Sequence, residues 1–187
     1  MIGNIDIFEN FLAPEECDSI LNKCKEELIL SDAKVYNSNP NTLPTKTTRK
    51  SSIGWITDLG FLNERLTKKL RETFNINGME VTGIGPFQFT EYKEGEYFDW
   101  HTDANNDVYR DRFTSIVIQL NNTYEGGILE IKNIKNELAL IENKIGTLYI
   151  FNSRLFHRVT PVVDGIRYSL VNWVSLVKTD STKQNIL

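Results

Sequence analysis

The feature that most constrains the fold is a change of sequence pattern near residue 80. Beyond that point, β-branched and aromatic residues gather in short runs that are separated by turn residues such as Asn121-Asn122 and Gly126-Gly127. The eight runs cover residues 83–92, 97–103, 113–121, 127–132, 137–142, 146–151, 155–160 and 166–177. Eight short strands after a helical segment favour a jelly-roll barrel. The paired glycines are predicted to form a hairpin turn with positive φ.

Two amphipathic helices are predicted before the strands. The first covers about residues 14–30, where Pro14 and two glutamates suit the first turn. Its apolar stripe consists of Cys17, Ile20, Leu21, Cys24 and Leu28. The second helix follows Asp58, a candidate N-cap, and its stripe consists of Leu59, Leu62, Leu66, Leu70 and Phe74. We expect both helices to support the sheet from outside, which gives a mostly β fold with flanking α structure.

Length and charge limit the classes of function. A chain of 187 residues with 40% hydrophobic content suits one domain over 1–187, with helical support to about residue 80 and the barrel over 81–178. The net charge of −4 argues against nucleic acid or anionic lipid as a partner. Small molecules or exposed protein segments are the expected partners. The N-terminus resembles no signal peptide, and no apolar stretch could span a bilayer, so we expect a cytoplasmic protein without a membrane partner.

The two cysteines are predicted to be reduced core thiols. Cys17 and Cys24 lie seven residues apart in the first predicted helix, which is about 10.5 Å along its axis at 1.5 Å per residue. That separation is too large for a disulfide. No neighbouring residues have the character of zinc ligands.

A polar stretch over about 31–52 is long for a connection inside a compact domain. It is rich in Ser, Asn, Thr and Pro, and three interpretations stay open: a lid over a substrate, a disordered loop or a plain surface excursion. Its basic cluster of Lys46, Arg49 and Lys50 is interpreted as a solvated loop edge, with contact to a substrate as the alternative.

The histidines give the strongest indication of chemistry. The chain has only two, His101 and His157, and the first belongs to a His-Thr-Asp sequence that ends at Asp103. Residues two apart on an extended strand project from the same face, so His101 and Asp103 could hold one ion together. Two imidazoles and one carboxylate form the facial triad of non-heme Fe(II) oxygenases. A His-x-Asp sequence alone is a weak motif, so its context decides.

That context resembles a known family. The run from Gln88 through Tyr92, Gly95 and Phe98 to His101 and Asp103 is similar to the Tyr-x-x-Gly-x-x-aromatic-x-x-His-x-Asp signature of prolyl 4-hydroxylase-like 2-oxoglutarate/Fe(II) dioxygenases. Further segments appear in the family's order: Phe11 to Cys17, Arg49 to Trp55, Arg112 to Thr114, Tyr124 to Glu130, Gly146 to Phe151 and His157 to Arg167. The resemblance covers nearly the whole chain and implies a double-stranded β-helix, a cupin-like jelly roll.

The resemblance also implies a ligand set and cofactors. It makes His101, Asp103 and His157 the iron ligands and Arg167 the anchor of the far carboxylate of 2-oxoglutarate. Dioxygen would be the second co-substrate and ascorbate the reductant that rescues oxidised iron. The residues support Arg167 independently, because on a strand it shares a face with Ser169, Val171 and Trp173, and an inward guanidinium is costly unless an anion meets it. The alternative is an outward Arg167 paired with a surface acid.

Three more side chains are candidates for the same pocket. Tyr92 and Thr114 resemble positions whose hydroxyls bind the co-substrate, and Trp173 resembles a tryptophan near the iron. Each has a plain alternative as a core residue. Arg112 and Asn172 are further candidates that could tune the pocket.

The predicted function is hydroxylation of an unactivated C–H, in a prolyl residue of a peptide or protein, with release of succinate and carbon dioxide. Three alternatives stay open: a non-catalytic jelly-roll binding module, a cupin enzyme that uses no 2-oxoglutarate, and a 2-oxoglutarate oxygenase acting on a small molecule or nucleic acid. Nucleic-acid demethylases of the superfamily usually carry a second arginine where this chain has Trp173.

Overall fold

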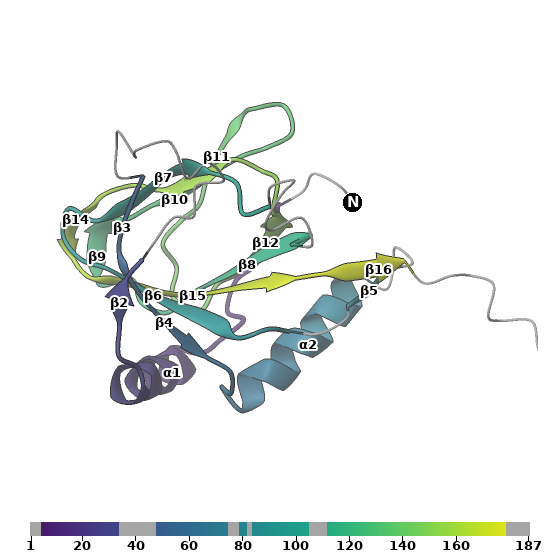
Figure 1. The fold of residues 1–187 in the computed structure, drawn as a ribbon, viewed down its shortest axis with the longest axis horizontal. Helices are drawn as coiled ribbons and strands as arrows, with labels where there is room; N and C mark the ends of the chain where they lie inside the picture. The colour runs from purple at the N-terminus through teal and green to yellow at the C-terminus, as the bar shows by residue number, and fades with distance from the viewer. Residues whose placement is uncertain (1–4, 34–47, 75–78, 82–83, 105–111, 179–187) are drawn as a thin grey trace, which may run out of the picture.

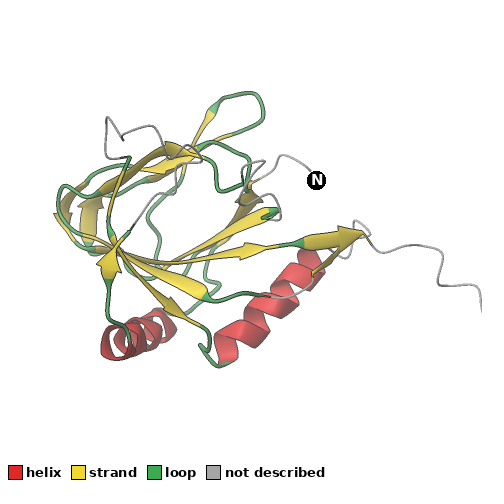
Figure 2. Ribbon diagram, in the orientation of Figure 1, coloured by secondary structure: helices red, strands yellow, loops and turns green. Residues whose placement is uncertain are grey.

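The protein is built from two β-sheets that face each other, with two helices against the outer face of the larger sheet (Figure 1). The computed structural model describes residues 5–33, 48–74, 79–81, 84–104 and 112–178. Figure 2 shows that strands predominate and that both helices lie on the same side. The mostly β jelly roll with flanking helices is therefore confirmed. Across the described strands the two sheets remain separate, so the expected barrel consists of two facing sheets and not a closed ring.

All paired strands run antiparallel, and most pairs join segments far apart in the sequence. The larger sheet has the order β1 (Ile5–Phe8), β12 (Leu148–Asn152), β8 (Thr114–Gln119), β15 (Arg167–Val174), β6 (Phe87–Tyr92), β4 (Ser52–Ile56) and β2 (Ser31–Asp32). The smaller sheet has the order β11 (Leu138–Leu140), β10 (Leu129–Lys132), β13 (His157–Val159), β7 (Tyr97–His101) and β3 (Arg49–Lys50). Two separate pairs join β9 (Tyr124–Gly126) to β14 (Val162–Gly165) and β5 (Met79–Val81) to β16 (Leu176–Lys178).

The helices bury the predicted apolar stripes under the larger sheet. Helix α1 spans Pro14–Glu27 and buries Cys17, Ile20 and Cys24. Helix α2 spans Phe61–Phe74 and buries Leu62, Leu66, Leu70 and Phe74. These side chains join one core with residues of β6, β8, β12 and β15. Both cysteines are free and buried, as predicted.

Two helix boundaries differ from the prediction. Helix α1 ends at Glu27 and not near residue 30, because Leu28 has the extended backbone of a C-cap (φ −104°, ψ 134°). Asp58 is not the N-cap of α2, which begins at Phe61. Its carboxylate instead accepts a hydrogen bond from the Gly60 N–H (2.7 Å), in a turn before the helix.

The alternation of side chains along β8 and β15 divides the interior into two regions. On β8, Ile116 and Ile118 pack with the helices, whereas Val117 belongs to a second core between the sheets. On β15, Leu170 and Val174 belong to the helix side. The alternate residues of β15 therefore project between the two sheets, as the period of two requires.

Gly126 and Gly127 have the predicted positive φ values of 71° and 54°. The predicted hairpin is wrong, because β9 pairs with β14 and β10 pairs with β11 and β13. The positive φ instead permits close packing, since a Cβ on Gly126 would lie 2.4 Å from the carbonyl oxygen of Pro161.

The predicted lid over 31–52 lies largely outside the described residues, as does Lys46. Its ends are described as β2 and as the segment that contains β3 and the start of β4. In the described part of the chain, neither helix is long and apolar enough to cross a membrane.

Candidate metal centre

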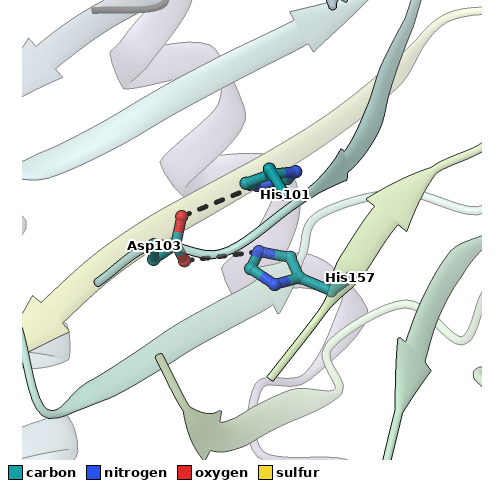
Figure 3. Close-up of side chains that lie close together, drawn as sticks. All are labelled: His101, Asp103 and His157. Carbon is teal, nitrogen blue, oxygen red and sulfur yellow. Dashed lines mark ion pairs between the residues drawn. The ribbon is translucent and has the colours of Figure 1, made fainter. Parts of the chain in front are cut away.

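Three side chains with metal-ligand atoms converge between the two sheets (Figure 3). His101 ends β7, Asp103 follows two residues later, and His157 begins β13, directly opposite His101 in the β7–β13 register. The Asp103 carboxylate lies 3.6 Å from Nε2 of His101 and 3.4 Å from Nε2 of His157. One ligand atom from each residue lies within 4.8 Å of the others. The antiparallel pairing of two strands thus brings together histidines that are far apart in the sequence.

Backbone carbonyls orient both imidazoles toward Asp103. Nδ1 of His101 lies 2.8 Å from the carbonyl oxygen of Asp99, and Nδ1 of His157 lies 2.9 Å from that of Leu155. A carbonyl can only accept, so each Nδ1 is the protonated nitrogen and donates. In a neutral imidazole the Nε2 lone pair then faces Asp103. Two lone pairs and a carboxylate that point at one another suit a cation between them.

Asp103 is fixed through its side chain and its main chain. Its Oδ2 accepts a 2.6 Å hydrogen bond from the Ser115 hydroxyl, which also lies 2.8 Å from the Ser153 hydroxyl. The Ser153 carbonyl accepts from the N–H groups of Asp103 and Ala104. Neither serine was predicted from the sequence. The signal that could have identified Ser115 is the alternation of side chains along β8, which turns Ser115 inward.

The pKa values of the three residues depend on one another. Burial acts to raise the pKa of Asp103, but the two histidines outweigh it and hold that pKa well below its usual value. Burial lowers the pKa of His101, and the charge of His157 lowers it further. Burial also acts to lower the pKa of His157, yet the Asp103 carboxylate more than compensates and raises it. Asp103 is thus ionised at neutral pH, as a metal ligand must be.

A cavity of about 580 Å³ contains this cluster and extends to β15. The inward residues Arg167, Ser169, Val171 and Trp173 of β15 all line it, as the sequence predicted for one strand face. The other walls include Arg49, Trp55, Tyr92 and Arg112.

Arg167 is a buried cation at this cavity, with only 2% of its surface exposed. Its Nη atoms donate to Ser169 Oγ (3.0 Å) and Gln119 Oε1 (2.9 Å), and its guanidinium lies 5.5 Å from the centre of the Tyr92 ring. Nε is buried without a hydrogen-bond partner in the described structure. Among the described residues, Arg167 forms no ion pair with a carboxylate, which excludes the surface pairing considered above within that part of the chain. A buried guanidinium that keeps an unpaired donor and has no carboxylate partner among the described residues suits an anionic ligand.

Comparison with known proteins agrees with this geometry. Residues 87–175, which include the three converging side chains and Arg167, match the 2OG-Fe(II) oxygenase superfamily. Over this segment, 89 of the 187 residues, the chain is similar to that superfamily. A PKHD-type hydroxylase of Idiomarina loihiensis is 28% identical over 133 residues, which are 67% of this chain and 61% of that protein. The chain thus spans about three fifths of the length of this curated relative.

Solved structures are similar over nearly the whole chain. A Pseudomonas putida prolyl-4-hydroxylase is 25% identical, with a TM-score of 0.70 and coverage of 92% of both chains. A Trichoplax adhaerens prolyl hydroxylase, solved with a peptide fragment of hypoxia inducible factor, is 21% identical with a TM-score of 0.75. It covers 91% of this chain and 83% of that one. The superfamily and the His-Asp-His cluster imply Fe(II) and 2-oxoglutarate, and the donor set and the partly unpaired Arg167 fit them.

The other site residues predicted from the sequence fall into two groups. Tyr92 and Trp173 line the cavity. Thr114 is buried but is not among the lining residues, because it lies on the same side of β8 as Ile116 while its neighbour Ser115 faces Asp103. A hydroxyl on that side does not reach the cavity.

Of the two weaker candidates, only Arg112 reaches the cavity. Its guanidinium lies 3.8 Å from the centre of the Trp173 ring. Asn172 points to the other side of β15, where its amide donates to the carbonyls of Gly85 and Pro86 (2.8 and 3.2 Å). It therefore cannot tune the pocket by direct contact.

Arg49 does not belong to a solvated loop edge, so that interpretation of the basic cluster is wrong for it. Its Nε donates to Ser51 Oγ (2.8 Å), and its guanidinium lies 4.6 Å from the centre of the Phe98 ring. Phe98 in turn stacks on His101 (3.4 Å between ring centres). Arg49 therefore forms part of the cavity wall, whereas Lys50 is exposed.

Proposed function

We propose that this chain is an Fe(II)- and 2-oxoglutarate-dependent dioxygenase that hydroxylates a prolyl residue in a peptide or protein. The balanced reaction consumes 2-oxoglutarate and dioxygen, releases succinate and carbon dioxide, and places one oxygen atom in the substrate C–H bond. The observation that carries the proposal is that one cavity contains the His101, Asp103 and His157 cluster together with the buried Arg167. We also propose that residues 1–187 act as one such domain, with the part before about residue 80 supporting a barrel over 81–178.

Each proposed ligand has a defined task. His101 and His157 would bind Fe(II) through Nε2, because their Nδ1 atoms are engaged by carbonyls. Asp103 would supply the anionic ligand, and Ser115 would hold its carboxylate in place. Bound Fe(II) would supply the redox chemistry, with dioxygen as the oxidant and 2-oxoglutarate as the donor of two electrons.

The proposed co-substrate and substrate positions divide the cavity. Arg167 would bind the far carboxylate of 2-oxoglutarate, with Tyr92 packed against the guanidinium. Trp173 lines the same cavity, and the Trp55 ring lies 6.1 Å from it and is 48% exposed. These two aromatic rings would form the apolar wall for a prolyl ring. The burial of Arg167 excludes bulk water from the charged end of the cavity.

The choice of a prolyl substrate rests on the relatives. The solved structures similar to this chain include prolyl hydroxylases, one of them in complex with a peptide. The cavity opens beside an exposed tryptophan, which suits an extended peptide more than a fully enclosed small molecule. Ascorbate is the proposed reductant that restores Fe(II) after unproductive turnover.

The test is turnover with proline-containing peptides. The Fe(II)-loaded protein is incubated with 2-oxoglutarate, ascorbate, air and a peptide library, beside a matched library with every proline replaced by alanine. We expect succinate in equal amount to peptide that gains one oxygen atom, and neither product from Asp103→Ala. Succinate without oxygen on proline would contradict the prolyl substrate. If the protein formed no succinate from 2-oxoglutarate with any substrate, that result would contradict the oxygenase assignment.

A further inference from the structure

Tyr124 has a buried hydroxyl that forms no hydrogen bond with any described residue. The residue begins β9, and 9% of its surface is exposed. Its Oη is buried, and no described group forms a hydrogen bond with it. An unpaired buried hydroxyl carries a desolvation cost that no hydrogen bond offsets. Such a group calls for an explanation, and a bound ligand is one that its neighbours can test.

Tyr124 lies beside Arg167. A Cβ on Gly127 would lie 3.0 Å from Arg167 Cδ and 3.0 Å from Tyr124 Cε2, so both side chains pack against the same glycine. The β9–β14 pair holds them there, because Tyr124 is paired with Gly165, two residues before Arg167. The proximity has an electrostatic effect: burial raises the pKa of Tyr124, and the positive charge of Arg167 and the approach of its guanidinium to the hydroxyl oppose that rise.

The described side chains fix the guanidinium, and no carboxylate among them neutralises it. The Gln119 amide donates to the carbonyls of Asn121 (2.9 Å) and Tyr168 (3.2 Å), which leaves its Oε1 to accept from Arg167. Two of the five N–H groups of Arg167 therefore have protein acceptors, and Nε has none in the described structure. The result is a pair of adjacent, buried and unsatisfied donors, Arg167 Nε–H and Tyr124 Oη–H. An acceptor with negative charge, such as a carboxylate, satisfies both.

We propose that the Tyr124 hydroxyl donates a hydrogen bond to the far carboxylate of 2-oxoglutarate beside Arg167, and thereby selects a dicarboxylate over a monocarboxylate keto acid. This inference rests on the proposed function. It assigns a role to a residue on β9, outside the strands β6, β8 and β15 where the sequence placed the co-substrate contacts.

The structure offers a matched control in Tyr149. This tyrosine is also buried, but its hydroxyl donates to the Glu142 carbonyl (2.8 Å) and is therefore already satisfied. Tyr124→Phe and Tyr149→Phe each remove one hydroxyl and leave the ring in place. Only the first removes a group that has no hydrogen-bond partner among the described residues.

The test compares two ligands in the two variants. The ligands are 2-oxoglutarate and 2-oxopentanoate, which has the same carbon chain but no far carboxylate. Each is titrated into Fe(II)-loaded protein without oxygen. Binding is followed by the visible charge-transfer band of a chelated keto acid. A hydrogen bond to a charged group contributes about 1.5–3 kcal/mol. We therefore expect Tyr124→Phe to weaken 2-oxoglutarate about tenfold or more and to leave 2-oxopentanoate unchanged within twofold. Tyr149→Phe should change the ratio of the two affinities by less than twofold.

Thermal unfolding separates this role from a structural one. Without ligand, Tyr124→Phe should melt at or above the wild-type temperature, because the lost hydroxyl forms no hydrogen bond in the described part of the chain. Equal weakening of both keto acids, unchanged binding of 2-oxoglutarate, or a lowered melting temperature would each overturn the role of Tyr124. A wild-type protein that binds iron but neither keto acid would instead overturn the proposed function, and the inference with it.

Discussion

The Ser115 hydroxyl donates a 2.6 Å hydrogen bond to Oδ2 of Asp103. Ser115 is fully buried on β8, in the larger sheet, whereas Asp103 follows β7 of the smaller sheet. The bond therefore ties the two sheets together at the metal centre. Partners of this kind orient a metal ligand and typically change metal affinity by 10–100-fold when removed.

Ser115→Ala should weaken Fe(II) binding about tenfold, because the Asp103 carboxylate loses the donor that fixes its orientation. The matched control is Thr114→Val, which removes a buried hydroxyl one residue away on the other side of β8. Equilibrium dialysis with Fe(II) without oxygen measures both. Equal weakening by the two substitutions would show that Ser115 acts through the packing of β8 and not through Asp103.

Gln119→Glu should weaken 2-oxoglutarate binding by more than tenfold. A carboxylate at this position would neutralise Arg167 from within the protein and repel the co-substrate. It would also leave the Asn121 and Tyr168 carbonyls without their donor, so the free energy of unfolding should fall by about 1–3 kcal/mol. Keto-acid titration and urea unfolding measure the two effects. Full affinity for 2-oxoglutarate in this variant would mean that Arg167 is not the carboxylate anchor.

Gly126→Ala should destabilise the protein far more than Gly95→Ala. Both glycines have positive φ (71° and 74°), so each substitution meets the same backbone strain of about 1–2 kcal/mol. Only at Gly126 would the new Cβ collide with a backbone oxygen, whereas nothing lies within 4 Å at Gly95. We expect an additional loss of about 1–3 kcal/mol at Gly126 in urea unfolding. Equal losses would contradict the close packing of β9 on the segment before β14.

The two cysteines should be inert in the folded protein and lower its stability at alkaline pH. Burial raises the pKa of Cys17 to about 11 and that of Cys24 to about 12, from an ordinary value of 9.0. As the pH rises above 9.0, the unfolded chain loses thiol protons that the folded chain retains, so stability is lost from there upward. A thiol-specific chromophoric reagent at pH 8 should label neither cysteine until urea unfolds the chain. Rapid labelling of the native protein would contradict the burial of α1.

The sequence predicted those parts of the fold that depend on local periodicity. The stripe of α2 and the inward face of β15 follow from periods of 3.6 and two residues, and both are confirmed. The strands β2 and β3 were not predicted, because they lie within the polar stretch over about 31–52, and β4 was not predicted although it contains Ile53, Trp55 and Ile56. Strand β1 was also missed. It consists of only four residues and pairs with β12, a contact that no local pattern encodes.

In the candidate site, too, residue types and local patterns predicted some features, whereas tertiary pairing determined the others. The convergence of His101, Asp103 and His157 was predictable from their types and spacing, together with the family resemblance. Thr114 was proposed by resemblance, but the alternation of β8 turns Ser115 inward in its place. The partners of Arg167 depend on strand register, which sets Gln119 opposite Ser169. Register arises from tertiary pairing, so Gln119 and Tyr124 could not be found from the sequence.

The central claim is that the His101, Asp103 and His157 cluster and Arg167 form one site for Fe(II) and 2-oxoglutarate. The most direct measurement is the addition of Fe(II), and then of 2-oxoglutarate, to the metal-free protein without oxygen, with Arg167→Ala as the matched variant. The account predicts one bound iron per chain in both proteins. It also predicts a visible charge-transfer band that appears with 2-oxoglutarate in the wild type and is lost in the variant. Iron binding without a band in the wild type, or an unchanged band in Arg167→Ala, would contradict it.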